Sequence, residues 1–569
     1  MQADHHERLS VGRSFLIPAA LYSLLFFALN PHLLTQFSVA FFFGGVDGFQ
    51  NVWNLWWVDK SLLQLHALPW HTTYLHAPTG TTLLGHTLNP FNGLLAIVLL
   101  PWLTMVQTYN AIVIFSFVTG GITAFWLCRA ITGSFAGSLL GGALFTFSNF
   151  HFMHADGHLQ LTALQWIPLF LLCWMRFCGD RTWRYALASG GSLVLVLLCD
   201  LYYFTYCVIG GAIFVAWQAW TTRDWRSLLR PSPLPLLAGF VAPVIATAGA
   251  LLGALVYHHA TDPFFGTHSP RDLSMDLLSP FVWGYYWRFR EAARPLWQPL
   301  SIYVTEASVH LGWSVIALAI YGWRQRFRVT LRQAGFWIAV IVFFGVMALG
   351  PNLKIAGHEL SIGRGISMMG HDDVNPLVLP YAVLWLLFPP WRLAGVPVRM
   401  MVMVQLAVAV LAAAGWHAAR TSPHRRVRAA SLVALLVIAV EYLPYPLPVT
   451  STAVPSYVRA LADLPDGAVI DLASNGPQAL YYQTVHHKPI AFGYISRTPT
   501  SVDQADLALS ALILAGAWDE AARSGGFRYV IKRDRVAEVM MRGLDGAPLA
   551  PIDPSREVFR DGDVAIYRF

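Results

Sequence analysis

Charged residues are scarce in this chain of 569 residues, and their scarcity excludes an ordinary soluble globular protein. Only 12% of the residues are charged, 56% are hydrophobic, and the mean hydropathy is +0.50. Soluble domains carry about 25% charged residues. The apolar residues fall in repeated uninterrupted runs, each long enough to cross about 30 Å of hydrocarbon. The sequence therefore predicts a polytopic α-helical membrane protein.

Cysteine is also scarce, and a disulfide framework is not expected. All five cysteines lie in or at the ends of apolar runs: Cys128, Cys173, Cys178, Cys199 and Cys207.

The net charge of +7 belongs to the membrane part of the chain, where we attribute it to basic residues in the loops that set the orientation. Nucleic acid is therefore not an expected partner. The last part of the chain lacks a phosphate-binding glycine loop and a nucleophile elbow.

The charge is uneven along the chain and divides it into two predicted domains. Residues 452–569 hold 26 of the 69 charged residues, about 22% of their length, against about 10% in residues 1–451. We interpret 1–451 as a transmembrane domain and 452–569 as a small water-soluble α/β domain. Its predicted elements are helices at 457–464 and 505–524, strands at 468–472 and 527–532, and a hairpin at 557–569.

Hydrophobic runs predict eleven full membrane spans, together with two re-entrant or interfacial segments at 90–106 and 377–391, which prolines interrupt. The first span is interpreted as a retained helix and not as a signal peptide. The eleven predicted spans are 14–30, 110–128, 134–150, 160–177, 184–199, 203–220, 236–258, 302–323, 334–350, 400–419 and 428–446.

Arginine clusters predict the orientation, because short cytoplasmic loops collect Lys and Arg. With eleven crossings, all the clusters fall on the side of the N-terminus, which is then cytoplasmic. The loops 31–109, 259–301 and 351–399 and the C-terminal domain then lie outside. We expect an integral protein of the bacterial plasma (inner) membrane, in contact with its lipids, whose function is concentrated on the exported face.

Asp47 is the first candidate catalytic residue. It lies a few residues beyond the first span and precedes a stripe of apolar residues at helical spacing: Phe49, Val52, Trp53 and Trp56. Such a helix would lie flat at the lipid interface and hold the carboxylate at the membrane surface. A carboxylate there can accept a proton from a hydroxyl that attacks a lipid-linked sugar. The alternative is an exposed Asp-Gly turn that caps the helix.

These features together resemble the GT-C superfamily of integral-membrane glycosyltransferases, which use sugars carried on polyprenyl phosphates. The resemblance covers most of the chain as an architecture: an acidic residue after span one, an interfacial helix, many spans and an exported α/β domain. It implies a GT-C-like fold and a transferase activity. Many members have paired acidic residues in the first loop, whereas here the next one is Asp59, twelve residues after Asp47.

A cluster of histidines is the second group of candidate site residues. His151, His154 and His158 are spaced so that a continuous helix would place all three on one face, with Asp156 beside them. We predict a substrate-binding role for the histidines, with His154, Asp156 and His158 as candidate ligands of a divalent metal ion. The resemblance favours Asp156 as a second catalytic residue. The alternative is an interfacial turn whose histidines meet water, and Gly157 could break the helix.

Further substrate-binding candidates lie on the same predicted face. Asp200 is an ionisable residue between two apolar runs, and Tyr202 beside it offers a surface for a sugar ring. Arg392 and Arg399 precede span ten, where a guanidinium could hold a donor phosphate. The alternatives are an interfacial aromatic turn and a pair of arginines that contact ordinary headgroups. The segment 494–497 is polar enough to contact an acceptor.

The sequence thus predicts a membrane glycosyltransferase, transferring a hexosyl or pentosyl group from a polyprenyl-phosphate donor to a glycan, lipid or protein acceptor outside the cytoplasm. Whether the transfer inverts or retains stereochemistry is left open. One alternative is a transporter or flippase for a lipid-linked saccharide, which would need polar residues at both faces. Another is a non-catalytic scaffold whose exported domain binds partners.

The orientation is testable by thiol labelling of variants that lack the native cysteines. Single cysteines placed beside Arg181, Arg326 and Arg426 should be shielded from a membrane-impermeant reagent added outside, whereas a cysteine at position 500 should react. Labelling beside the three arginines, but not at position 500, would reverse the topology.

Overall fold

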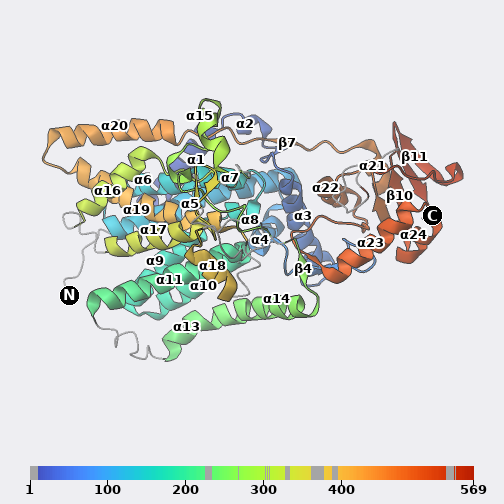
Figure 1. Cartoon of the computed structure of the whole chain (residues 1–569), viewed down its shortest axis with the longest axis horizontal. Helices are drawn as coiled ribbons and strands as arrows, with labels where there is room; N and C mark the ends of the chain where they lie inside the picture. Colours follow the sequence, from blue (N-terminus) through green and yellow to red (C-terminus); the bar gives the residue numbers. More distant parts are fainter. Residues whose placement is uncertain are drawn as a thin grey trace.

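The computed structural model describes most of the chain as a helical bundle, with a small sheet at one end of the molecule (Figure 1). The bundle comprises the helices before residue 442, and the sheet lies beyond α3 (Asp47–Asp59) at the end where the C-terminus lies. The described residues are 11–223, 234–266, 268–301, 303, 306, 308–326, 333–360, 377–387, 395–533, 544 and 546–569.

Among the residues that the structure describes, five helices are long and apolar enough to cross a membrane. The last of them is the centre of the bundle, since an 18-residue stretch of it is entirely buried and α5, α6, α16 and α17 pack around it. The five are Gly12–Leu29 (η1 Gly12–Leu16 and α1 Ile17–Leu29), α5 (Met105–Thr132), α11 (Leu201–Thr222), Ala238–Thr261 and Pro397–Arg420 (η7 Pro397–Met400 and α19 Met401–Arg420).

The other predicted spans correspond to shorter helices of 12 to 17 residues, so the total of eleven crossings stays a prediction. They are α6 (Phe135–Thr146), α9 (Trp166–Asp180), α10 (Trp183–Cys199), α16 (Trp313–Arg324), α17 (Ala334–Ala348) and α20 (Arg425–Glu441). The span at 236–258 is built from α13 (Leu234–Val244), η3 (Ile245–Gly249) and α14 (Ala250–Thr261).

The described helices of the two interrupted segments are short. The helix α4 (Pro90–Leu99) has 10 residues, about 15 Å at 1.5 Å per residue, which is half of a hydrocarbon core. The described part of 377–391 contains only α18 (Pro380–Leu387), and 388–391 lie outside the described residues. Neither described helix is long enough to cross.

One predicted boundary is wrong, and it matters for the site. The span predicted at 302–323 begins as a helix only at Trp313, after Gly312 with φ +84°. The described residues Tyr303, Glu306 and 308–312 are therefore outside the helix. An apolar run reports burial equally well for a helix and for a buried loop, so hydropathy alone cannot locate the first turn.

Capping residues explain where several helices begin. Thr104 accepts a hydrogen bond from the Gln107 backbone N–H, and the Gln107 side chain accepts one from the Thr104 N–H, which together start α5. Ser134 caps α6 by accepting a bond from Gly137, and Asn89 caps α4 ahead of Pro90.

The C-terminal region contains a four-stranded sheet in the order β11-β12-β10-β8. The strands β8 (Ala468–Asp471) and β10 (Phe527–Lys532) are parallel, and β12 (Val564–Arg568) is antiparallel to β10 and to β11 (Glu557–Asp561). Both predicted strands and the hairpin are confirmed. The helices of this region are α21 (Ser456–Asp463), α22 (Gly476–His486), α23 (Thr500–Leu514) and α24 (Trp518–Gly525).

One helix prediction for this region is corrected, and one helix was not predicted. The single helix expected at 505–524 is two helices, α23 and α24, because Gly516 adopts φ +72° between them. The helix α22 was not expected, although Asn475 caps it and Pro477 lies in its first turn. The domain boundary at 452 stays a prediction.

The C-terminal region is bound tightly to the first loop. Strand β1 (Ala40–Phe41) pairs with β7 (Thr450–Ser451), and β4 (Phe264–Phe265) pairs with β9 (Thr498–Pro499). The Trp53 Nε1–H donates a buried hydrogen bond of 2.6 Å to Gln483 Oε1, which joins α3 to α22. The segment 494–497 is thereby held beside the start of α3.

The prediction that the tryptophans of α3 lie in the lipid interface is wrong. Eleven of the 13 residues of α3 are buried, because α4 packs against one side and α22 against another. Trp53 stacks on Trp57, and Trp56 stacks on His487. A helix face with several tryptophans can face either lipid or another part of the protein. Here the C-terminal region packs against α3, so the tryptophans face protein.

The remaining elements of the described residues are short. They are α2 (Leu33–Gln36), η2 (Lys60–Gln64), β2 (His71–Thr72), β3 (Thr81–Thr82), α7 (Asn149–Ala155), α8 (Leu159–Thr162), η4 (Ser279–Phe281), α15 (Arg290–Trp297), η5 (Gln298–Leu300), β5 (Lys354–Ile355), β6 (His358–Glu359) and η8 (Pro554–Arg556).

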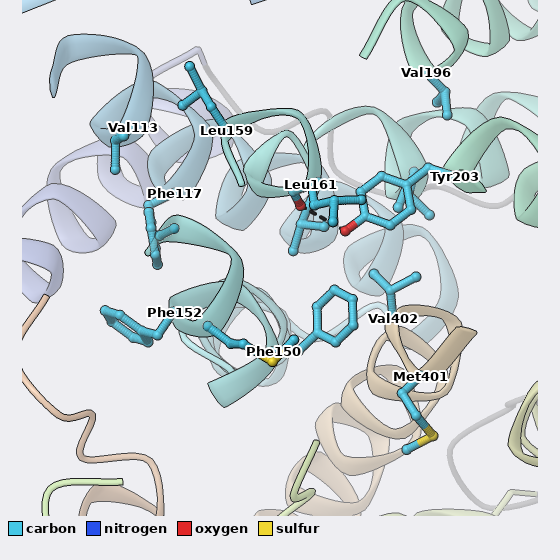
Figure 2. Close-up of a cluster of buried hydrophobic side chains, with 14 of the residues drawn as sticks. Val113, Phe117, Phe150, Phe152, Leu159, Leu161, Val196, Tyr203, Met401 and Val402 are labelled. Atoms are coloured by element: carbon cyan, nitrogen blue, oxygen red, sulfur yellow. Dashed lines mark hydrogen bonds between the residues drawn. The ribbon is translucent and has the colours of Figure 1, made fainter. Parts of the chain in front are cut away.

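A cluster of buried hydrophobic side chains fixes α7 and α8 (Figure 2). Phe150 and Phe152 of α7 and Leu161 of α8 lie in one cluster with residues of α5, α11 and α19. The Tyr203 hydroxyl of α11 donates a 2.7 Å hydrogen bond to the Leu161 carbonyl. The turn between α7 and α8 is therefore held in place by side chains of several helices.

Close packing of α16 on α19 gives a stability prediction. Gly415 of α19 and Gly322 of α16 lie against each other, and a Cβ on Gly415 would overlap the carbonyl oxygen of Leu318. Gly415→Ala should destabilise the protein by about 1–3 kcal/mol, because the helices must separate. Thermal unfolding in detergent measures the shift.

The matched control is Gly345→Ala in α17, where nothing lies within 4 Å of the new Cβ. It should be neutral or stabilising, since Ala is favoured over Gly by about 1 kcal/mol inside a helix. Equal midpoints for Gly415→Ala and the wild type would contradict the close approach.

Candidate active site

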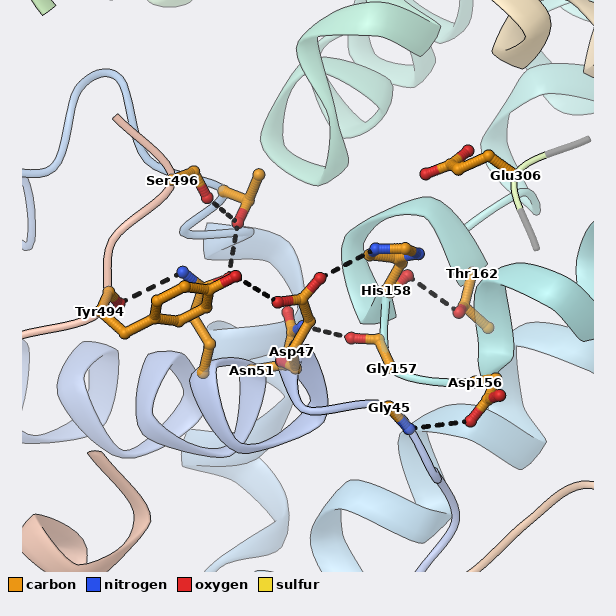
Figure 3. Close-up of polar contacts among 12 residues, drawn as sticks. Gly45, Asp47, Asn51, Asp156, Gly157, His158, Thr162, Glu306, Tyr494 and Ser496 are labelled. Atoms are coloured by element: carbon orange, nitrogen blue, oxygen red, sulfur yellow. Dashed lines mark hydrogen bonds and ion pairs between the residues drawn. The ribbon is translucent and has the colours of Figure 1, made fainter. Parts of the chain in front are cut away.

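Asp47 begins α3 and is the first residue of the site (Figure 3). Its Oδ1 accepts a 2.7 Å hydrogen bond from the Tyr494 hydroxyl, and its Oδ2 lies 3.1 Å from His158 Nε2. The carboxylate is therefore held on both oxygens, by one residue from the first half of the chain and one from the C-terminal region.

Electrostatics favour an ion pair between Asp47 and His158. Burial raises the pKa of Asp47, but the hydrogen bond and charge of His158, together with the Tyr494 hydrogen bond and the charge of Arg399, outweigh it, so the net pKa is below the usual value. Burial lowers the pKa of His158, but Asp47 and Glu306 outweigh it and raise the pKa above 6.5. Asp47 is consequently ionised at neutral pH, a state in which a carboxylate can accept a proton.

Asp156 positions the loop that leads into α3. Its Oδ1 accepts hydrogen bonds from the backbone N–H groups of Gly44 (2.6 Å) and Gly45 (3.1 Å), and its Oδ2 accepts one of 2.7 Å from the Tyr286 hydroxyl. Burial raises the pKa of Asp156, against the opposing effect of these bonds. Gly45 lies so close to the Asp156 carbonyl that a Cβ would meet it at 2.8 Å.

The three histidines do not share one helix face. The helix α7 ends at Ala155, and Gly157 with φ +115° turns the chain before His158. His151 is fully buried, with its ring nitrogens 2.7 and 2.8 Å from the carbonyls of Thr146 and Thr162. The structure therefore places His151 in the core and separates it from His154 and His158.

A candidate metal site combines His154 and His158 with Glu306. One ligand atom from each residue lies within 4.8 Å of the others. Neither nitrogen of His154, nor Nδ1 of His158, has a hydrogen-bond partner among the described residues. Two imidazoles and a carboxylate suit a transition metal such as Zn²⁺. Compared with the predicted ligand set, Glu306 replaces Asp156, whose oxygens are occupied by the first loop and Tyr286.

Glu306 also forms a buried ion pair with Arg399. The Arg399 Nη2 lies 2.5 Å from Glu306 Oε1, and the guanidinium carbon lies 5.1 Å from the centre of the Tyr202 ring. Burial raises the pKa of Glu306, but the charge of Arg399 outweighs it and holds the pKa well below the usual range. Arg392, the other predicted phosphate ligand, lies outside the described residues.

Several of these side chains line a cavity of about 340 Å³, here called the Asp47 cavity. It brings together five of the predicted residues: Asp47, His158, Asp200, Tyr202 and Arg399. The segment 494–497 contributes four more lining residues, Tyr494, Ile495, Ser496 and Arg497.

Asp200 has a structural role as well as a place in the cavity wall. It accepts a 3.1 Å hydrogen bond from the Tyr203 backbone N–H and so begins α11. Burial raises the pKa of Asp200 to about 6, against the opposing charge of Arg399.

Sequence reasoning missed two of the residues that define the site. Glu306 was assigned to a span, although an acidic residue in an apolar run is itself a sign of function. Tyr286 carries no such sign. The polar run at 494–497 was noticed as a potential acceptor contact, but nothing in its spacing relates it to Asp47, 447 positions earlier.

The chain belongs to the family described as a domain of unknown function, DUF6311, whose model matches residues 16–364, more than half of the chain. The matched part contains Asp47, His158, Asp200 and Glu306, whereas Arg399 and 494–497 lie beyond it. No curated protein matches the sequence.

Solved structures with a similar arrangement share little sequence with this chain. The oligosaccharyltransferase of Archaeoglobus fulgidus in the apo form is 11% identical at a TM-score of 0.47, over 91% of this chain and 69% of that chain. The AglB oligosaccharyltransferase of the same organism, in complex with an inhibitory peptide and a dolichol-phosphate, is 12% identical at 0.46, over 91% and 69%. ArnT from Cupriavidus metallidurans in the apo state is 11% identical at 0.45, over 97% of both chains. Because these TM-scores lie below 0.5, the similarities carry no argument about what this chain binds or does.

Proposed function

We propose that the protein is an integral-membrane glycosyltransferase of the GT-C type, which moves a hexosyl or pentosyl group from a polyprenyl-phosphate donor to an acceptor. The observation that carries the proposal is the Asp47 carboxylate, which is held ionised by His158 and Tyr494 in the wall of the Asp47 cavity. A positioned carboxylate of this kind is suited to accept a proton from a reacting hydroxyl.

Asp47 acts in this proposal as the general base. The acceptor hydroxyl gives its proton to Asp47 while its oxygen forms a bond to the anomeric carbon of the donor sugar. The bond from that carbon to the phosphate oxygen breaks, and its electron pair leaves with the polyprenyl phosphate. A guanidinium beside the phosphate stabilises the charge that develops on it, which is the role proposed for Arg399.

The lining of the Asp47 cavity supports a lipid-linked donor. Leu251, Leu252 and Leu255 of α14 form an apolar wall, and Asp47, His158 and Arg399 provide the polar end. An amphiphile with a phosphate and a prenyl chain matches both parts, because the apolar wall takes a hydrocarbon and the charged groups take the head.

A divalent cation on His154, His158 and Glu306 is part of the proposal. The two nitrogens of His154, which have no hydrogen-bond partner in the part of the chain that the structure describes, and the nearby Glu306 carboxylate fit such an ion. When bound, the cation supplies positive charge that binds and orients oxygen atoms of the phosphate or sugar. Because Glu306 is shared with Arg399, metal binding and the Arg399 ion pair compete for one carboxylate. Metal binding also competes with the Asp47–His158 ion pair, since a His158 that holds the cation is a neutral imidazole, whose Nε2–H can still donate to Asp47.

We further propose that the reaction takes place on the extracytoplasmic side of a bacterial plasma membrane, with a glycan, lipid or protein as acceptor. Arginine-rich loops favour a cytoplasmic N-terminus and an exported C-terminal region, which carries Tyr494 and Arg497 to the cavity.

The base is tested by Asp47→Asn. Asparagine keeps the size of the side chain but does not accept the proton, so transfer should fall about a hundred- to ten-thousand-fold. Transfer is measured with purified protein and a panel of polyprenyl-phosphate sugars. Asp59→Asn is the matched control, since Asp59 lies at the other end of α3, about 18 Å away along the helix axis. Wild-type transfer by Asp47→Asn would exclude Asp47 as the base.

The metal site is tested by His154→Asn. After treatment with a chelator, the wild type should rebind Zn²⁺ or Mn²⁺ in a one-to-one ratio, and the variant should bind at least about tenfold more weakly, because even indirect changes around a metal cost that much. Titration calorimetry measures the affinity. His32→Asn is the control because His32 contacts Leu447 and lies outside the triad. Unchanged affinity in His154→Asn would remove this residue from the site.

A further inference from the structure

Arg497 brings a second guanidinium from the C-terminal region into the Asp47 cavity. The residue is only 8% exposed, and it immediately precedes β9, which pairs with β4. Its Nη1–H donates a 2.7 Å hydrogen bond to the Ser496 carbonyl, which fixes the side chain along the segment. The position of Arg497 therefore depends on the docking of the C-terminal region.

Arg399 and Arg497 share a neighbour in the cavity wall. Arg399 lies over the ring of Tyr202, and the Tyr202 side chain is also in electrostatic contact with Arg497. Burial and the nearby charge of Arg399 lower the pKa of Arg497 below its usual value. Two like charges brought together in a buried site destabilise each other, and an anion that contacts both removes that cost.

The rest of the wall indicates which anion fits. Glu306 already forms an ion pair with Arg399. The charge of Arg497 is therefore a positive charge in addition to that ion pair. The apolar residues of α14 lie in the same cavity as the two guanidinium groups. An anion with a hydrocarbon tail satisfies both features, whereas a free anion satisfies only the first.

We propose that Arg497 completes the donor site by holding, together with Arg399, the phosphate of a prenyl-phosphate lipid, so that the C-terminal region takes part directly in substrate binding. This inference rests on the proposed function and deepens it. The planar guanidinium suits a phosphate because two N–H groups can bind two oxygens at once.

The test measures binding and requires no sugar transfer. Full-length protein in nanodiscs is titrated with a short-chain prenyl phosphate, and the dissociation constant is measured by calorimetry for the wild type, Arg497→Gln and Arg497→Lys. We expect binding about ten- to a hundredfold weaker in Arg497→Gln, since a charge-assisted hydrogen bond is lost. Arg497→Lys should lose less affinity than Arg497→Gln, because lysine keeps the positive charge, although it cannot make the bidentate contact.

Controls separate the sources of the effect. Arg528→Gln removes an arginine of β10 whose Nη1–H contacts the Asp466 carbonyl, outside the cavity lining, and should bind like the wild type. Inorganic phosphate should bind far more weakly than the prenyl phosphate. Equal affinity for the two would overturn the lipid assignment, and wild-type affinity in both Arg497 variants would overturn the inference.

Asp47→Asn distinguishes this inference from the proposed function. If Asp47→Asn transfers sugar normally while Arg497→Gln loses prenyl-phosphate binding, the base assignment fails and the binding site stands. If Asp47→Asn is inactive and the Arg497 variants bind normally, the transferase proposal stands and Arg497 has no part in it.

Discussion

The carboxylate of Asp156 is the contact on which the geometry of the site depends. One of its oxygens binds the N–H groups of Gly44 and Gly45 in the first loop. The other binds the hydroxyl of Tyr286, which lies 130 positions after Asp156. Asp47 follows Gly45 by two residues, and His158 follows Asp156 by two. Because Asp156 joins the first loop to the turn between α7 and α8, Asp47 Oδ2 and His158 Nε2 are brought to 3.1 Å from each other. Loss of this anchor would release both partners together.

The site combines charges, in and beside the Asp47 cavity, that are costly to bury singly. Asp47 is balanced by His158, and Glu306 is balanced by Arg399. Asp200 is stabilised by a backbone N–H and by the charge of Arg399. The attraction within each pair opposes the desolvation of its members, so removal of one member would leave its partner as a buried charge without a counter-charge. Such a network also keeps reactive groups in defined protonation states before a substrate arrives.

The C-terminal region is part of the site as well as part of the fold. Paired strands β1–β7 and β4–β9 and the bond from Trp53 to Gln483 attach it to the membrane part of the chain. Tyr494 reaches Asp47 only because of this attachment. A sequence pattern that marks 452–569 as water-soluble is compatible with a separate domain and with a docked one, since both have a charged surface.

Composition and hydrophobic runs by themselves determined that the chain is a helical membrane protein, and local signals placed several elements of the sheet and the candidate residues Asp47, His158, Asp200, Tyr202 and Arg399. These properties depend on short-range periodicity and on the cost of placing ionisable groups beside apolar runs. Only the tertiary structure decided that α3 is buried, that Asp156 positions a loop, that His151 belongs to the core, and that Glu306, Tyr494 and Arg497 join the site. Each of these depends on contacts between segments far apart in the chain, and no local pattern of residue types encodes which distant segment a side chain will meet.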